Sequence, residues 1–253
     1  MPASTRRINR GGGHSYVLDG ETVDGVTKIV RDGVPKSNLI GWAARSVAGY
    51  AVDHWAELAE LTPSKRLREL ERAAWAERDA AGARGTTVHK YAHQIAEGAV
   101  VEVPDELVGY VDAYLAFSAA YDVLEVEVEA TVINRTWHYM GTVDLLAYID
   151  GELWLLDWKT GASGIWPETA LQLAAYANAE TVLGDEGERP MPAVARAAAV
   201  WLRGDGYDVV PVDAGAETFR TFLYAQQMAR FTNAQRSDYV RDALPPRELE
   251  PAT

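Results

Sequence analysis

Residues 141–161 read GTVDLLAYIDGELWLLDWKTG, and this stretch decides the expected fold. Two apolar runs flank an Asp-Gly pair at positions 150–151. Asp-Gly between apolar runs is a strong hairpin signal, because the tight turn needs positive φ at its centre. Leucines recur on both faces of the two strands, which is typical of buried strands: Leu145, Leu146, Leu153, Leu155 and Leu156. The stretch therefore predicts a central, buried β-hairpin.

The turn also determines which residues face each other. A two-residue turn pairs Ile149 with Glu152, and counting outward then pairs Asp144 with Asp157. Directly opposed Cβ atoms lie about 4.5–5.5 Å apart, where like charges are destabilising. Strand alternation places Lys159 on the face of Asp157, so two carboxylates and one ammonium converge. A divalent cation with oxygen ligands would compensate the repulsion, whereas the alternative, a surface hairpin with solvated charges, fits poorly with apolar strands.

At these residues the chain resembles the PD-(D/E)XK nucleases. Gly-x-x-Asp at 141–144 and Asp-x-Lys at 157–159 are similar to the core motifs of that family. The RecB-like exonuclease branch adds Gly-x-x-x-His on an upstream helix, matched at 85–89, and Gln-x-x-x-Tyr on the next helix, matched at 172–176. The four motifs occur in the family's order and span about a third of the chain. Each motif is weak alone, but four in order are a strong signal.

The resemblance implies a role for each motif residue. His89, Asp144 and Asp157 would bind one or two Mg²⁺ or Mn²⁺ ions, with the backbone carbonyl of Trp158 as a further ligand. Asp144, Asp157 and Lys159 would form the catalytic set. Lys159 would orient the attacking water and stabilise developing charge. Only five of the 24 Lys and Arg residues are Lys, so a Lys in an apolar strand stands out against the composition.

Five further residues have softer assignments. Gln172 and Tyr176 share one helix face, which in the family helps to bind DNA, although a core Tyr with a capping Gln is the alternative. Arg84 is a candidate DNA contact, and Glu129 stands where relatives often carry an acidic residue. His93 lies four residues after His89, but the Glu of the metalloprotease motif is absent. We therefore take His89 as the ligand and His93 as a helix-surface or supporting residue.

The activity implied by the resemblance is a divalent-metal-dependent DNA exonuclease that processes DNA ends, double- or single-stranded, for recombination or repair. A phage origin, and a single-strand annealing protein as partner, would fit this branch. Two alternatives stay open: a structure-specific endonuclease on the same fold, and a non-catalytic DNA-binding protein with a relic nuclease fold. The intact His89, Asp144, Asp157 and Lys159 favour an active enzyme.

Composition limits these functions. No stretch of the 253 residues approaches the roughly 20 apolar residues of a membrane span, so no membrane association is expected. The chain has no cysteine, which excludes disulfides and the four-cysteine iron–sulfur cluster of several RecB-like relatives. It also favours a cytoplasmic protein, in the host cytoplasm if the protein is phage-encoded.

The net charge of −13 counts against a nucleic-acid binder, because phosphate contacts need Lys and Arg. We therefore expect an acidic outer surface with a local basic groove. Its candidate residues lie near the N-terminus and in a charged helical stretch: Arg6, Arg7, Arg10, Lys65, Arg66, Arg68 and Arg84. For the second group, an ordinary solvated helix with i,i+4 ion pairs is an equal alternative.

The expected fold class is α/β (α+β), with a restriction-endonuclease-like core of a mixed sheet flanked by helices, plus extra N-terminal helices. The predicted units are a disordered basic arm (1–13), a single nuclease domain (14–240) and a tail (241–253). Within the domain we expect a helical part, a catalytic core and a C-terminal helix, at 37–121, 122–212 and 214–236. Local patterns further predict a small β-element, an interrupted helical stretch and a loop, at 14–34, 64–98 (broken near 82–85) and 184–190.

Overall fold

The computed structural model describes residues 5–10, 13–184 and 187–244. The strands are β1 (Arg6–Arg10), β2 (Gly13–Leu18), β3 (Glu21–Val23), β4 (Leu124–Asn134), β5 (Tyr139–Ile149), β6 (Glu152–Lys159), β7 (Thr181–Gly184), β8 (Gly187–Pro190), β9 (Arg196–Arg203) and β10 (Gly206–Pro211). The helices are α1 (Val26–Gly33), α2 (Ser37–Asp53), α3 (Trp55–Ala59), α4 (Pro63–Ala96), α5 (Asp105–Ala120), α6 (Glu168–Ala177), α7 (Ala216–Thr232) and α8 (Arg236–Tyr239).

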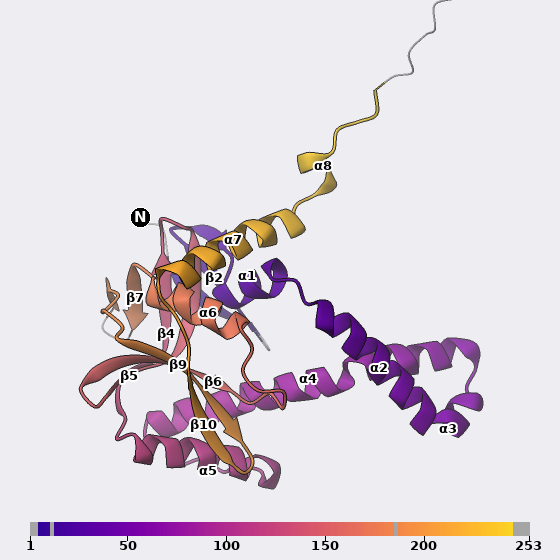
Figure 1. The fold of residues 1–253 in the computed structure, drawn as a ribbon, viewed down its shortest axis with the longest axis horizontal. Helices are drawn as coiled ribbons and strands as arrows, with labels where there is room; N and C mark the ends of the chain where they lie inside the picture. The colour runs from indigo at the N-terminus through magenta and orange to yellow at the C-terminus, as the bar shows by residue number, and fades with distance from the viewer. Residues whose placement is uncertain (1–4, 11–12, 185–186, 245–253) are drawn as a thin grey trace, which may run out of the picture.

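A seven-stranded sheet forms the centre of the molecule, in the order β10-β9-β6-β5-β4-β7-β8. β6 and β9 pair in parallel and the other neighbours pair antiparallel, so the sheet is mixed. Helices α4 and α5 cover one face, while α1, α6 and α7 cover the other (Figure 1). The predicted fold class, a mixed sheet flanked by helices, is confirmed.

The β5–β6 hairpin turns as its sequence predicts. Asp150 and Gly151 have φ of 50° and 79°, the left-handed values that a tight hairpin turn requires. Ile149 pairs with Glu152, so the predicted register is confirmed. The β5–β6 ladder ends at Leu145–Leu156, whereas β6 continues to pair with β9 as far as Lys159. Asp144 and Asp157 are therefore the next pair in register, at the point where the two strands separate.

Both faces of the hairpin are buried against helices. Leu146, Leu153 and Leu155 pack on the side of α1, α6 and α7. Leu156 and Trp158 pack on the side of α4 and α5. The apolar strands thus place the end of the β5–β6 ladder, next to Asp144 and Asp157, inside the molecule, where a charged side chain needs a partner.

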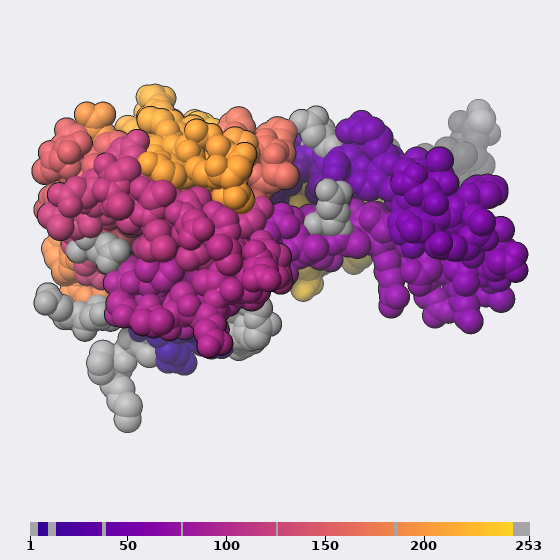
Figure 2. Space-filling view, turned by 90° about the horizontal axis from the view of Figure 1, so that it is seen from below, coloured from indigo at the N-terminus to yellow at the C-terminus, as the bar shows by residue number. Residues whose placement is uncertain are grey.

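Helices α2 and α3 and the first half of α4 project from this body, as Figures 1 and 2 show. α4 is continuous over 34 residues, about 51 Å, so the predicted break near residues 82–85 is wrong. The two glycines there are Gly82 and Gly85, and each costs a helix only about 1 kcal/mol relative to Ala. The stretch around them is rich in alanine. A cost of that size does not interrupt a helix that is packed at its far end.

The N-terminal part departs most from prediction. Residues 6–10 are not disordered: β1 pairs with β2 from Arg6–Val17 to Arg10–Gly13, in a small sheet with β3. Positions 1–4, 11–12 and 245–253 of the predicted arm and tail lie outside the described residues. The expected β-element at 14–34 ends in a helix, α1.

The segment at 184–190 is not a plain loop, because β7 and β8 pair antiparallel there. Gly187, the first residue of β8, has a φ of 99°, a left-handed value that glycine adopts at no steric cost. Among the described residues, no helix is both long and apolar enough to cross a membrane.

Candidate active site

Asp144 lies at the end of the β5–β6 ladder and is held from two sides. Its Oδ2 accepts a hydrogen bond from the Trp158 backbone N–H at 2.8 Å. Its Oδ1 lies 3.3 Å from His89 Nδ1, and only 13% of the side chain is exposed. Burial opposes ionisation, but the neighbouring charges of His89 and Lys159 and the Trp158 N–H hold the pKa of Asp144 below its ordinary value. Asp144 is therefore a buried carboxylate kept in its charged form.

His89 reaches the same place from α4. Its Nε2 lies 2.9 Å from the Trp158 carbonyl oxygen, while Nδ1 faces Asp144. Burial would lower the pKa of His89, but the charge of Asp144 and the hydrogen bond to it raise the pKa above its ordinary value. The imidazole thus joins two of the predicted ligands, the Asp144 carboxylate and the Trp158 carbonyl.

Asp157, on the adjacent strand, has its own partners. Its side chain is 2% exposed, and its Oδ2 forms an ion pair with Lys159 Nζ. Gln172 Nε2 donates to Asp157 Oδ1 at 3.0 Å, and Lys159 Nζ donates to Gln172 Oε1 at 3.2 Å. Burial and the charge of Asp144 raise the pKa of Asp157, although Lys159 opposes this rise. The two carboxylates therefore differ in environment as well as in partner.

Tyr176 completes this second group. Gln172 Nε2 also donates to the Tyr176 hydroxyl at 3.0 Å, so one amide joins the tyrosine to Asp157. Tyr176 is 2% exposed, and burial raises the pKa of its hydroxyl well above the ordinary value. The alternative in which Gln172 caps a helix is not what its contacts show, because both of its amide atoms face the site.

Two motif glycines lie where a neighbouring side chain approaches the backbone closely. A Cβ atom on Gly141 would lie 2.4 Å from Tyr176 Cε1, so the tyrosine ring packs on the bare backbone of β5. A Cβ on Gly85 would lie 3.0 Å from Thr160 Oγ1, where α4 passes the end of β6. The two glycines therefore let α6 and α4 press their motif residues against the hairpin end.

The structure brings the predicted ligands together without closing a metal cage. Within the described residues, no group of three or more His, Asp or Glu side chains forms a ready metal site. His89 and Asp144 form one pair, Asp157 and Lys159 form another, and the backbone of Trp158 runs between them. Trp158 itself is 3% exposed, with its ring against Tyr114 at 5.4 Å, so this backbone is firmly anchored.

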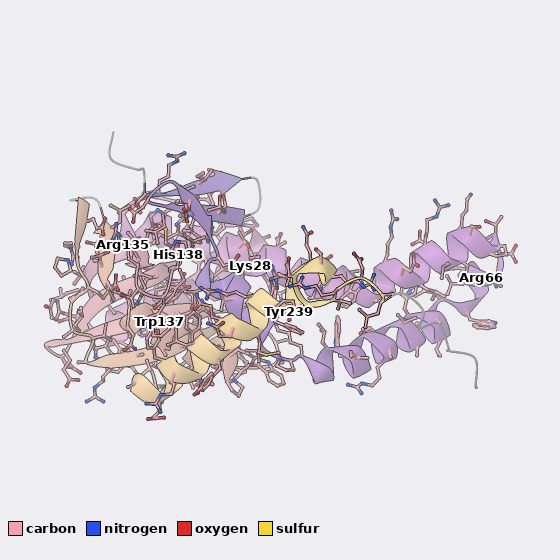
Figure 3. The ribbon with its side chains drawn as sticks, turned by 90° about the horizontal axis from the view of Figure 1, so that it is seen from above. Lys28, Arg66, Arg135, Trp137, His138 and Tyr239 are labelled. Carbon is pink, nitrogen blue, oxygen red and sulfur yellow. The ribbon has the colours of Figure 1, made fainter. Side chains whose placement is uncertain are left out.

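Other predicted residues lie elsewhere. Arg84 places its guanidinium over the Tyr110 ring at 5.7 Å, a stacking contact with α5. His93 Nε2 lies 3.6 Å from Oε1 of Glu97, the residue that follows α4. Arg66 donates to three carbonyls around α3 at the far end of the projection (Figure 3), so it does not line the site.

Glu129 is the predicted residue with an unexpected partner. It accepts from Arg7 Nη2 at 2.9 Å, and Arg7 Nη1 lies 3.3 Å from Thr142 Oγ1. Arg7 was predicted only as part of a basic groove. Tyr16 also contacts Thr142, with 2.9 Å between the two hydroxyl oxygens. Burial is the main cause of the raised pKa of Tyr16, and the charges of Glu129 and Asp144 contribute to it.

The match to a family model decides the classification. The model described as the PD-(D/E)XK nuclease superfamily matches residues 33–243. The chain belongs to this superfamily. Its members are nucleases that generally use divalent metal ions such as Mg²⁺. The N-terminal sheet, β1 to β3, precedes the matched region.

Other comparisons add little. No curated protein matches the chain at a significant level. A solved structure titled "Crystal structure of SSO0001" aligns with 86% of this chain and 80% of that chain, at 12% identity and a TM-score of 0.38. A similarity of this size carries no argument about function.

Proposed function

We propose that this PD-(D/E)XK protein is a divalent-metal-dependent DNA exonuclease of the RecB-like type, which processes DNA ends for recombination or repair. The observation that carries the proposal is the pair of Asp157, which is buried, and Asp144, which is only 13% exposed, at the end of the β5–β6 ladder. Burying two carboxylates in register without a function would be costly. A partner that anneals single strands, and a place in the cytoplasm of a phage host, fit such an enzyme.

The donor set fits a hard divalent cation. Asp144, Asp157 and the Trp158 carbonyl would supply oxygen ligands and His89 an imidazole, which suits Mn²⁺ and tolerates Mg²⁺. Adjacent ligands at about 2.1 Å from an octahedral ion lie about 3 Å apart. The 2.9 Å between His89 Nε2 and the Trp158 oxygen is compatible with that spacing. His89 would have to be neutral at Nε2, so binding and proton loss are coupled.

The bound ion would activate water and stabilise charge at phosphorus. The chain's own residues then position what reacts. Lys159 Nζ, whose side chain is 29% exposed, would hold the attacking water and the developing negative charge near Asp157. Gln172 fixes both Lys159 and Asp157 through its amide, so it orients this pair. The choice of an exonuclease over an endonuclease rests on the resemblance of the motifs around His89, Gln172 and Tyr176 to those of the RecB-like branch.

A digestion series tests the proposal. End-labelled linear duplex, linear single strand and covalently closed circular DNA are incubated with Mg²⁺, Mn²⁺ or a chelator. We expect metal-dependent loss of label from linear DNA, no cutting of closed circles, and no activity with the chelator. Rapid cutting of closed circles would show an endonuclease instead. Inactivity on all three substrates with both metals, by a folded protein, would contradict the nuclease proposal.

A further inference from the structure

The small N-terminal sheet reaches the active site although it precedes the region that the family model matches. Arg7 of β1 is the residue that makes the connection. Its three donor groups are all directed at protein acceptors: Nη2 to Glu129 at 2.9 Å, Nη1 to Thr142 at 3.3 Å and Nε to Asn9 at 2.8 Å. The guanidinium is therefore held in one orientation by groups on three different strands.

Glu129 lies next to the predicted metal ligands. In the register of β4 and β5, the pairs on either side leave Glu129 opposite Asp144. Glu129 has a φ of 50°, a left-handed value that is uncommon for a residue with a side chain and departs from strand geometry. Such conformations persist where surrounding contacts impose them, and they cluster at functional sites. At Glu129, one such contact is the ion pair with Arg7.

Thr142 is fixed from the same sheet. It precedes Asp144 by two residues on β5, and its Oγ1 contacts both Arg7 of β1 and the Tyr16 hydroxyl of β2. Tyr16 is 5% exposed, and both contacts to Thr142 are partly buried. Strands β1 and β2 together therefore hold the backbone segment that carries Asp144.

We propose that Arg7 is a positioning residue of the active site, which holds Glu129 and Thr142 beside Asp144 and offsets the charge of Glu129. The inference rests on the proposed function, since the charge matters through the metal and the DNA phosphate. Without Arg7, the Glu129 carboxylate adds uncompensated negative charge beside Asp144. A cation then binds more tightly and an anionic substrate binds less well. A loss of structure alone would weaken both.

The test measures these two effects separately. Mn²⁺ affinity is measured by calorimetric titration without DNA, and KM and kcat are measured on linear DNA with saturating metal. For Arg7→Gln we expect about threefold to tenfold tighter Mn²⁺ binding and a rise in KM of similar size, from one partly screened charge. Glu129→Gln should shift both in the opposite direction. The double variant should return both towards wild type, because the charges are removed together.

Arg135→Gln is the matched control. Arg135 (Figure 3) forms ion pairs with Asp19, which follows β2, and with Glu188 of β8, so it also ties the N-terminal part to the body. It lies six residues after Glu129, about 20 Å along an extended strand. This variant should lose thermal stability without any change in Mn²⁺ affinity or KM.

The outcomes separate the inference from the proposed function. If wild type binds Mn²⁺ and cuts DNA, but Arg7→Gln leaves both constants unchanged or weakens both, Arg7 is only structural and the inference is overturned. If Arg7→Gln does not fold, Glu129→Gln alone tests the inference. The inference requires that Glu129→Gln binds Mn²⁺ more weakly than wild type, so unchanged or tighter binding overturns it. If folded wild type neither binds Mn²⁺ nor cuts DNA, the proposed function fails and the inference fails with it.

Discussion

The two halves of α4 are one continuous helix with different surroundings. In the second half, Val88 and Ala92 are 0% and 3% exposed, and His89 between them reaches the site. In the first half, Leu67 and Trp75 are 57% and 38% exposed, and the helix packs mainly on α2. Helix propensity extends through both halves, while tertiary contacts determine which half carries chemistry.

Charge differs between the halves in the same way. At the site that His89 reaches, the side chains of Asp144, Asp157 and Lys159 are 13%, 2% and 29% exposed, and each contacts another residue of the site. In the first half the ion pairs are exposed, such as Arg78–Asp79, and pairs of this kind contribute about 0–1 kcal/mol. Residues 36–84 carry eight Lys or Arg and seven Asp or Glu, so their net charge is +1, against −13 for the chain. The predicted basic groove stays a prediction, and this projecting segment is less acidic than the chain as a whole.

The largest effect should come from Asp157→Asn in the active site, which the buried half of α4 reaches through His89. Removing one charge from the predicted metal ligands should abolish Mn²⁺ binding and lower kcat by about 1,000-fold or more. The fold should survive, because Asn can still accept the hydrogen bond from Gln172. Calorimetric titration and single-turnover cleavage measure the two losses. Asp79→Asn in the exposed half is the control and should change neither. Unchanged Mn²⁺ affinity in Asp157→Asn would remove Asp157 from the ligand set.

The second prediction separates catalysis from metal binding. Lys159→Ala should lose cleavage by about 100- to 1,000-fold, the usual cost of removing one group that stabilises developing charge. It should keep metal binding, because an ammonium group is not a ligand. Lys159→Arg should rescue only in part, since a planar guanidinium differs from a compact ammonium. The assay is single-turnover cleavage with metal and DNA saturating, and a near wild-type rate for Lys159→Ala would reduce the residue to a structural role.

The sequence predicts features that depend on contacts between neighbouring residues, and it misses features that depend on contacts between residues far apart in the chain. The β5–β6 register was predictable because a two-residue turn is a local feature. The contact between Arg7 and Glu129 joins residues 122 positions apart, and neither carries a local signal for it. β1 was missed for the same reason: a short polar strand is stabilised by its partner β2 rather than by its own pattern.

Stability gives a third, smaller contrast between the halves of α4. Val88→Ala removes fully buried methyl groups and should lower the free energy of unfolding by about 1–3 kcal/mol. Leu67→Ala removes a larger side chain that is mostly exposed, and it should cost less than about 0.5 kcal/mol. Urea unfolding of both variants measures the difference. Equal costs would mean that the first half of α4 is buried in solution, for instance against another molecule.

The smallest predicted effect is a pH-dependent change in stability at Asp32 of α1, and an exposed ion pair in the first half of α4 is the control. Asp32 accepts from Arg31 Nε at 2.7 Å and from Asn233 Nδ2 at 3.0 Å, which joins α1 to the end of α7. The hydrogen bond from Arg31 is the main cause that lowers the pKa of Asp32 from 3.8 to about 2. A carboxylate with a lowered pKa stabilises the fold above its unfolded pKa, and this stabilisation is lost as the pH falls through its folded pKa. Asp32→Asn should therefore lower stability at pH 7 by about 1 kcal/mol after solvent screening, and its difference from wild type should shrink between pH 4 and about 2. Asp79→Asn, which removes an exposed pair, should show no such pH-dependent difference in thermal unfolding followed across this range.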